Sequence, residues 1–345
     1  MPAPTYHLDP HTLREIADNQ DEASEYADTL LARYRALALH PDKQQDLASD
    51  LVQWLRITGQ FSRAEEVART SVSRSGGAEL LENLASPAAP VEVPLRLILP
   101  IVRLATALAC NADNDPTKVS QAADLFDACE NALIEDMLAA RIASPENMLR
   151  LSVVLHNRAK LRLSVGDRIL ALRDANLALT LRLKCTAPSE LVASSQFCVD
   201  ALLVLIETDI EQQVNAAGAS IATETFAAGD RSGFGAVSGD KRVGPWLFWF
   251  KDGRIKSAGH YLNDQLTGPW VWFREHGWLL QEGSFANNLQ EGMWVRYYAN
   301  GNILDRGHFT AGKKTGHWEY FNEDGSPKHV ARRERYSLLR KLTGR

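Results

Sequence analysis

Apolar residues recur three and four positions apart through most of residues 10–213, which is the spacing of one face of an α-helix. Leu151, Val154 and Leu155 show this spacing clearly. Asp9-Pro10 and Ser144-Pro145 add start signals, since in each a capping residue precedes a proline at the first helical position. The Gly-, Ser- and Pro-containing stretch 74–93 is predicted to be a loop. The pattern predicts helices at 10–18, 22–39, 42–58, 61–73, 94–112, 117–136, 146–164, 167–184 and 189–213.

From residue 244 onward the pattern changes to short aromatic runs that return every 24 residues. Each run leads to a dipeptide such as Asp252-Gly253 or Asn300-Gly301, which favours a tight turn, and then to a second apolar run. One unit is therefore predicted to be a β-hairpin, and stacked hairpins to form a continuous antiparallel sheet. The residues that repeat without change are expected to hold this scaffold together: Trp246, Trp270, Trp294, Trp318, Gly253, Gly277, Gly301 and Gly325.

These residues follow the pattern G-x-W…(Y/F)-x-x-(D/N)-G…G-x-(Y/F) and resemble MORN-type repeats, specifically the bacterial variant found in antitoxin-like proteins. The resemblance covers roughly the last third of the chain. It implies a β-hairpin sheet, and a bacterial cytoplasmic adaptor, inhibitor or immunity factor that docks on a partner protein. A fold alone does not fix an activity.

Two helix pairs in the first part of the chain resemble tetratricopeptide repeats. In the clearer pair, Ala159, Gly166, Ala171 and Ala178 occupy the small-residue positions of that motif. The alternative is an unrelated helical bundle, because any closely packed helix pair favours Ala and Gly at the contact.

The sequence thus predicts an α+β multidomain protein with four parts. Gly229 and Gly235 lie on the 24-residue grid, so a degenerate first repeat without its Trp is expected to cap the array. The small and polar residues of the linker favour proteolytic nicking, and cleavage there is a candidate regulatory step. The predicted parts are a tetratricopeptide-like helical domain (1–213), a linker (214–223), a MORN-variant domain (224–330, with repeats 224–243, 244–267, 268–291, 292–315 and 316–330) and a basic C-terminal helix (331–345).

The charge distribution and the cysteine content narrow the classes of binding partner and the cellular location that we expect. Residues 328–345 carry seven Lys or Arg and one Glu, so the rest of this chain of net charge −5 is acidic and a poor candidate for nucleic-acid binding. The N-terminus lacks the basic and apolar regions of a signal peptide. The four cysteines form no CxxC pair, which favours reduced thiols and a cytoplasmic location.

Catalytic and metal-binding patterns are not found. Gly307 to Lys313 approaches a phosphate-binding loop, but Lys314 stands where Ser or Thr should bind magnesium. His260 and His308 share one repeat position, yet four strands at ~4.8 Å would separate them by roughly 20 Å. We therefore expect no catalytic residue, no metal, no cofactor and no small-molecule substrate, and hence a protein that is not an enzyme.

Positions that differ between the repeats are the candidates for partner contact. Trp, Tyr and Arg dominate the energetically important residues of interfaces. The alternative is that these side chains only pack on the helical domain. A second function, from another class, is binding to anionic membrane lipids through the sheet and the basic tail. The candidate partner-binding residues are Trp272, Arg274, Trp278, Arg296 and Tyr298.

Overall fold

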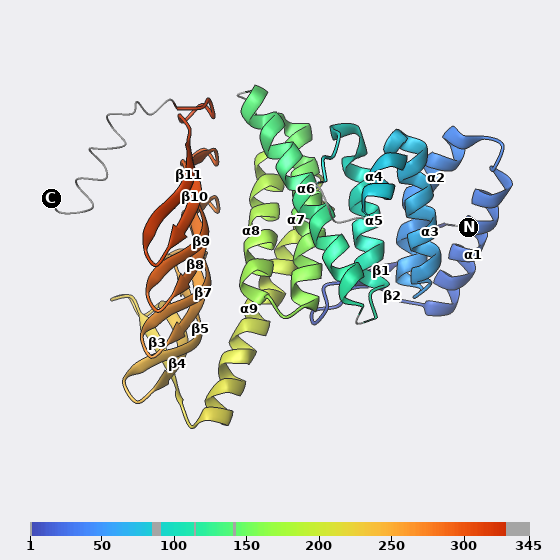
Figure 1. Ribbon diagram of the computed structural model, residues 1–345. Helices are drawn as coiled ribbons and strands as arrows, with labels where there is room; N and C mark the ends of the chain where they lie inside the picture. Colours follow the sequence, from blue (N-terminus) through green and yellow to red (C-terminus); the bar gives the residue numbers. More distant parts are fainter. Residues whose placement is uncertain (1, 85–90, 114, 141–142, 329–345) are drawn as a thin grey trace. The chain divides into compact units, whose positions relative to one another are not determined.

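The computed structural model describes residues 2–84, 91–113, 115–140 and 143–328 (Figure 1). The chain divides into two compact units. The first comprises Met1–Asp136 with Ser144–Leu205, and the second comprises Met137–Ala143 with Ile206–Arg345. The division between the two long segments falls inside a single helix, α9 (Ser189–Ala217).

Helices account for most of the first unit. Phe126, Leu55 and Ile98 are among its fully buried side chains. The first three helices pack in succession, α5 packs on α3 and on α7, and α7 and α8 form the most extensive pair. The helices are α1 (Gln20–Ala36), α2 (Pro41–Ile57), α3 (Phe61–Val72), α4 (Ala78–Asn83), α5 (Ile98–Cys110), α6 (Pro116–Ala140), α7 (Pro145–Ser164) and α8 (Arg168–Lys184).

Local capping explains where α7 and α8 begin. The Ser144 hydroxyl accepts a hydrogen bond from the Asn147 amide at 3.1 Å. The Asp167 carboxylate accepts one from the Leu170 amide at 3.2 Å. Gly166, with φ of +84°, makes the turn between the two helices. The helix boundaries predicted from the sequence are therefore close to those observed here.

Small residues lie where α7 and α8 approach each other. Ala159, Ala171 and Ala178 have no exposed surface. These contacts are the ones that a tetratricopeptide repeat needs, but ordinary close helix packing needs them too. The tetratricopeptide-like interpretation of this unit stays a prediction.

The helix predicted at 10–18 is wrong. That region forms a two-stranded antiparallel sheet of β1 (Tyr6–Leu8) and β2 (Glu15–Ala17). The Asp9 carboxylate, predicted to cap a helix, instead accepts hydrogen bonds from the His11 amide and the Thr12 hydroxyl and closes a turn. Leu13 in that turn has φ of +56°, which a helix cannot accommodate.

The loop predicted at 74–93 is also largely wrong over its described part. A kinked turn at Ser73–Gly77 connects α3 to α4, and a 3₁₀ turn at Leu95–Leu97 precedes α5. Gly76, with φ of +87°, allows the change of direction. Gly77 packs so closely against Val72 and Leu97 that a Cβ would not fit there. Residues 85–90 lie outside the described residues.

The second unit contains a nine-stranded antiparallel sheet whose strands lie in sequence order from β3 to β11 (Figure 1). This arrangement confirms the predicted fold class, a helical region followed by an antiparallel hairpin sheet. The predicted helix 331–345 lies outside the described residues. The strands are β3 (Ser220–Thr225), β4 (Arg231–Ser238), β5 (Lys241–Trp249), β6 (Ile255–Leu262), β7 (Gln265–Phe273), β8 (Leu279–Ala286), β9 (Leu289–Tyr297), β10 (Ile303–Thr310) and β11 (Lys313–Tyr320).

The segment predicted as a linker, 214–223, is mostly helix and strand. Helix α9 continues to Ala217 and β3 begins at Ser220, so only Gly218 and Ala219 lie between them. Gly218 has φ of +61°, which lets the chain reverse sharply from helix to strand. The first hairpin therefore starts before the predicted degenerate repeat at 224–243.

Candidate interaction surface on the repeat sheet

A column of tryptophans crosses one face of the sheet, which we call the aromatic face. Each tryptophan lies flat over a glycine of the preceding strand, as Trp294 of β9 does over Gly283 of β8. The indole N–H of Trp294 donates to the Ser284 carbonyl at 3.1 Å. Every glycine of this column lacks room for a Cβ, which explains why glycine repeats there. The four pairs are Gly235 with Trp246, Gly259 with Trp270, Gly283 with Trp294, and Gly307 with Trp318.

Further aromatic rings extend the column into a continuous ladder. Trp272 stacks on Trp270 with ring centroids 5.4 Å apart and reaches Trp294 at 6.1 Å. Phe248 bridges Trp246 and Trp270 in the same way. Tyr261, Phe285 and Phe309 meet the tryptophans edge-on. Such pairs contribute about 0.5–1.5 kcal/mol each beyond the area they bury.

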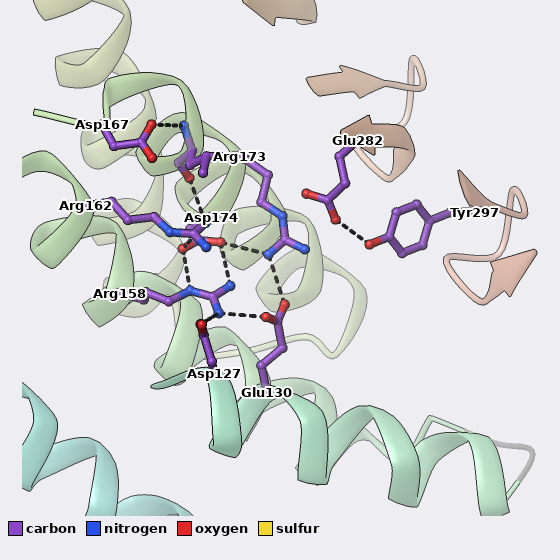
Figure 2. Close-up of polar contacts among 10 residues, drawn as sticks. Asp127, Glu130, Arg158, Arg162, Asp167, Arg173, Asp174, Glu282 and Tyr297 are labelled. Atoms are coloured by element: carbon purple, nitrogen blue, oxygen red, sulfur yellow. Dashed lines mark hydrogen bonds and ion pairs between the residues drawn. The ribbon is translucent and has the colours of Figure 1, made fainter. Parts of the chain in front are cut away.

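The opposite face of the sheet is more aliphatic. Leu247 and Val271 have no exposed surface, and Phe273 and Leu279 are nearly as buried. Further along the same face, the Tyr297 hydroxyl donates to the Glu282 carboxylate at 2.5 Å (Figure 2). On the aromatic face the column of Trp246, Trp270 and Trp294 is buried, but Trp272 beside it is half-buried and Arg296 is exposed, so this face offers side chains for contact with another molecule.

Two of the five predicted partner-binding residues, Trp272 and Arg296, occupy the variable column beside the tryptophans. Trp272 is half-buried between its aromatic neighbours. The Arg296 Nε donates to the Asp305 carboxylate at 2.8 Å. This hydrogen bond raises the pKa of Arg296, and Asp305 itself is 2% exposed. Arg296 therefore neutralises a buried carboxylate in addition to facing outward.

Arg274 and Tyr298 share one repeat position and make the same contact with different side chains. Arg274 Nη2 donates to the Tyr297 carbonyl at 2.8 Å, and the Tyr298 hydroxyl donates to the Phe321 carbonyl at 3.0 Å. Each reaches the backbone of the next hairpin. Their contribution to hairpin stacking was missed from the sequence, where a change of residue type suggested freedom from structural constraint.

Trp278, the fifth candidate, also contacts the next hairpin. Its indole lies so close to Gly301 that a Cβ there would sit 2.6 Å from a ring carbon. A large side chain at 278 is therefore matched to glycine at 301. The role of all five residues in partner binding stays a prediction.

A groove of about 620 Å³ lies at the turn end of the hairpins β5–β6 and β7–β8. It brings together Trp272 and Arg274 from the predicted set. Cationic and aromatic side chains predominate in its lining, with Glu275 as the acidic member. The residues that define this turn groove are Phe250, Arg254, Lys256, Trp272, Arg274 and His276.

Cations also lie over the rings at both ends of the ladder. The Arg242 guanidinium is 4.8 Å from the Trp246 ring centroid, and Lys314 Nζ is 3.5 Å from the Trp318 ring. Burial lowers the pKa of Lys314 despite the opposing charge of Asp305. The aromatic face is therefore bordered by positive charge at each end.

A buried charge cluster in the helical unit is a second concentration of polar groups (Figure 2). Arg158, 3% exposed, donates to both oxygens of Asp174, at 2.8 and 3.0 Å. It also contacts Glu130 at 2.7 Å, and Arg173 Nη1 contacts Glu130 at 3.0 Å. Burial alone would raise the pKa of Asp174, but the Arg158 and Arg162 charges outweigh it and lower that pKa. Because these charges satisfy one another among the described residues, removal of one partner would leave a buried charge uncompensated, and the cluster is therefore better explained as part of the structure than as a binding site.

The geometry places the second unit among β-hairpin repeat arrays. The family model of the MORN repeat variant matches residues 266–287 and 290–311. The two matched segments correspond to the hairpins β7–β8 and β9–β10. This part of the chain consists of MORN-variant repeats, which are often protein- or lipid-binding modules. The comparison with curated proteins gave no match.

Proposed function

We propose that the chain is a non-catalytic protein-binding protein whose MORN-variant sheet docks on a partner protein. Its role would be that of an adaptor, inhibitor or immunity factor, as the antitoxin-like form of the repeats implies. One observation carries the proposal: a constant tryptophan column supports a neighbouring column whose residues change from hairpin to hairpin. A repeat scaffold with a variable surface column is suited to recognising a particular protein. The variable column consists of Phe248, Trp272, Arg296 and Tyr320.

The chemistry of the buried nucleophiles supports a role other than catalysis. Two nucleophilic side chains approach the buried His156: Ser194 Oγ lies 3.5 Å from its Nε2, and Cys198 Sγ lies 4.0 Å from its Nδ1. Burial raises the pKa of Cys198 to about 11 and pushes the pKa of His156 well below its ordinary value. A neutral thiol beside a neutral, buried imidazole is poorly placed to attack a substrate. The unpaired thiols at Cys110, Cys129 and Cys198 are buried, which fits the proposed cytoplasmic location.

Binding to anionic lipids is the alternative, and charge argues against it for the sheet. Residues 224–328 contain twelve Lys or Arg and twelve Asp or Glu, so they offer no net attraction to an anionic membrane. The basic residues 331–345 lie outside the described residues. Among the described residues, one helix, Ser189–Asn215, is long and apolar enough to cross a membrane by length and composition, and 33% of its apolar window is buried within the protein. Its buried residues Cys198, Leu202, Ile206 and Ile210 lie four apart and so share one face of the helix.

The proposal includes regulation by cleavage between the units. A protease requires an extended, accessible backbone. Gly218 is exposed and Ala219 is half-buried, and regular structure occupies the chain on both sides of them. A regulatory protease would therefore have to recognise this one short junction.

Affinity purification from the native host tests the proposal. Tagged wild-type protein is compared with Trp272→Arg, which copies Arg296 at the equivalent position of the next repeat; circular dichroism verifies that this variant is folded, because Trp272 also stacks on Trp270. Val165→Arg is the matched control, because Val165 is an exposed apolar residue of the helical unit. Mass spectrometry should identify one partner with the wild type and the control, and not with Trp272→Arg.

The salt dependence of binding and sedimentation with vesicles distinguish protein binding from lipid binding. Partner binding should largely survive added salt, whereas sedimentation with phosphatidylserine vesicles should be abolished by it. Recovery of the same partner by Trp272→Arg would contradict docking through the aromatic face. Salt-sensitive vesicle binding without a protein partner would favour the lipid function.

A further inference from the structure

The turn groove is positively charged although the sheet around it is neutral. Arg254, Lys256 and Arg274 contribute positive charge to its lining. Glu275 is the acidic side chain in the lining. Since residues 224–328 balance twelve cationic against twelve acidic residues, this excess is local to the groove.

The cations of the turn groove retain unused capacity to bind an anion. Lys256 is exposed and forms no ion pair within the described residues, and its Nζ lies 6.0 Å from the Phe250 ring. Arg254 pairs only with Asp252 of its own turn, and its side chain is 60% exposed. Both side chains can therefore meet a ligand without breaking a contact between hairpins.

Arg274 adds an unsatisfied donor. Its Nη2 is held by the Tyr297 carbonyl, which fixes the guanidinium at the groove wall. Its Nε is buried and finds no hydrogen-bond acceptor among the described residues. Because this Nε has no accessible surface, a carboxylate in the groove would pair with the charge of the Arg274 guanidinium and not with Nε itself.

Apolar surface separates these cations. The Trp272 and Phe250 rings line the groove, and Leu280, 37% exposed, also faces it. A free anion would leave this surface uncovered, whereas an apolar side chain flanked by carboxylates would cover it.

We propose that the turn groove binds an extended acidic segment of a protein partner. Its carboxylates would meet Lys256 and Arg274, and an apolar side chain between them would rest on Trp272. This inference rests on the proposed protein-binding function and adds the site and the chemistry of the partner. Because aromatic rings and Leu280 line the groove together with the cations, a peptide that carries both carboxylates and an apolar side chain fits it better than the anionic headgroups of a membrane surface.

Fluorescence polarisation with synthetic peptides tests the inference on the full-length protein. The probes are fluorescein-labelled peptides of about ten residues, roughly 33 Å when extended, with Asp and Glu at different spacings around Leu or Phe. Each has a counterpart in which Asn and Gln replace the acids. We expect acidic peptides to bind more tightly than their neutral counterparts. Equal binding by all acidic and neutral pairs would overturn the inference.

Lys256→Glu is the decisive variant, because the side chain is exposed and the fold does not depend on it. It should weaken the binding of acidic peptides about tenfold. Lys313→Glu makes the same charge change at an exposed position of the edge strand β11 and should have less than about a twofold effect. Equal weakening by both variants would mean that general electrostatics, and not the groove, attracts the peptides.

Two further outcomes separate this inference from the proposed function. If the native partner is captured equally by wild type and Lys256→Glu, but not by Trp272→Arg, the groove inference fails and the protein-binding function stands. If phosphatidylserine–phosphatidylcholine vesicles sediment wild type but not Lys256→Glu, and no acidic peptide binds, the groove recognises lipid headgroups and the inference is overturned.

Discussion

The fit between Gly283 and Trp294 makes Gly283→Ala a sharp test of how the hairpins are joined. A Cβ at 283 would lie 2.6 Å from Cγ of Trp294 and closer still to two other indole carbons. Carbon atoms prefer separations of about 3.5–4.0 Å, so the ring would have to move by roughly 1 Å. The position is otherwise undemanding, because the φ of Gly283 is not positive.

Two effects determine how much Gly283→Ala lowers the free energy of unfolding. Overpacking of this kind costs about 1–3 kcal/mol. Displacing the indole also weakens its hydrogen bond to the Ser284 carbonyl, which contributes about 1 kcal/mol. We therefore expect Gly283→Ala to lower the free energy of unfolding of the sheet by about 2–4 kcal/mol.

Urea unfolding followed by tryptophan fluorescence measures this loss. Seven of the eight tryptophans lie in residues 246–318, so the signal reports mainly on the sheet. Gly253→Ala is the matched control: Gly253 has φ of +82° and open space around it, so its substitution costs about 1–2 kcal/mol from backbone strain alone. A loss at Gly283 no larger than at Gly253 would contradict the steric explanation.

A double-mutant cycle isolates the contact itself. Trp294→Ala alone should cost about 3–5 kcal/mol, because the side chain is 2% exposed. Adding Gly283→Ala to that variant should cost close to nothing, since the ring that excludes the Cβ is gone. The same cost for Gly283→Ala with and without the indole would refute the reasoning.

The remaining predictions concern the charge cluster, the hairpin contacts and the junction. Arg158→Ala should destabilise the helical unit by about 3–5 kcal/mol in urea unfolding followed by circular dichroism, because Asp174 stays buried without its main partner; a loss below about 1 kcal/mol would contradict this. The pKa of Asp174 is lower in the folded state than in the unfolded state. Its ionised carboxylate therefore contributes to the free energy of unfolding above the unfolded-state pKa of ~3.9, and this contribution is lost as pH falls through the folded-state pKa. Melting temperature should therefore drop below about pH 4, and a flat profile there would count against it. Tyr298→Phe should cost the sheet about 1 kcal/mol through the lost bond to the Phe321 carbonyl, and no change in urea midpoint would argue that solvent replaces that bond. Limited proteolysis should cut first at Gly218-Ala219, and first cuts within α9 would show that the helix frays.

The repeat sheet could be predicted from the sequence because one period specifies strands, turns and scaffold residues together. Positive φ at Gly253, Gly277 and Gly301 is what the turn dipeptides predict. The helices could be predicted where capping and periodicity agreed. Asp9-Pro10 shows the limit of such local signals, since the same carboxylate can cap a helix or close a turn, and tertiary packing decides between them.

The candidate site was predicted less completely than the fold. Variation between repeats identified Trp272 and Arg274, which the structure brings together in one groove. The same criterion could not reveal that Arg274 and Tyr298 reach equivalent carbonyls, because side chains of different length and chemistry can donate to the same backbone acceptor. Lys256 and Leu280 were missed because each stands in a strand irregularity next to the turn, where no regular alternation predicts its direction.

The pairing of each tryptophan with a glycine of the preceding hairpin gives the array a direction. The glycine of each hairpin is covered by the tryptophan of the next hairpin, and the tryptophan of the same hairpin covers the glycine of the hairpin before it. The first hairpin has no earlier neighbour, so it can dispense with a tryptophan and still needs Gly235. At the other end, the sequence has Ala331 one period after Gly307 and Leu342 one period after Trp318, so the glycine is absent where no further tryptophan follows. The first unit of the array therefore contributes a glycine but no tryptophan, and the last contributes a tryptophan but no glycine. An additional repeat would need both residues, one to contact each of its neighbours.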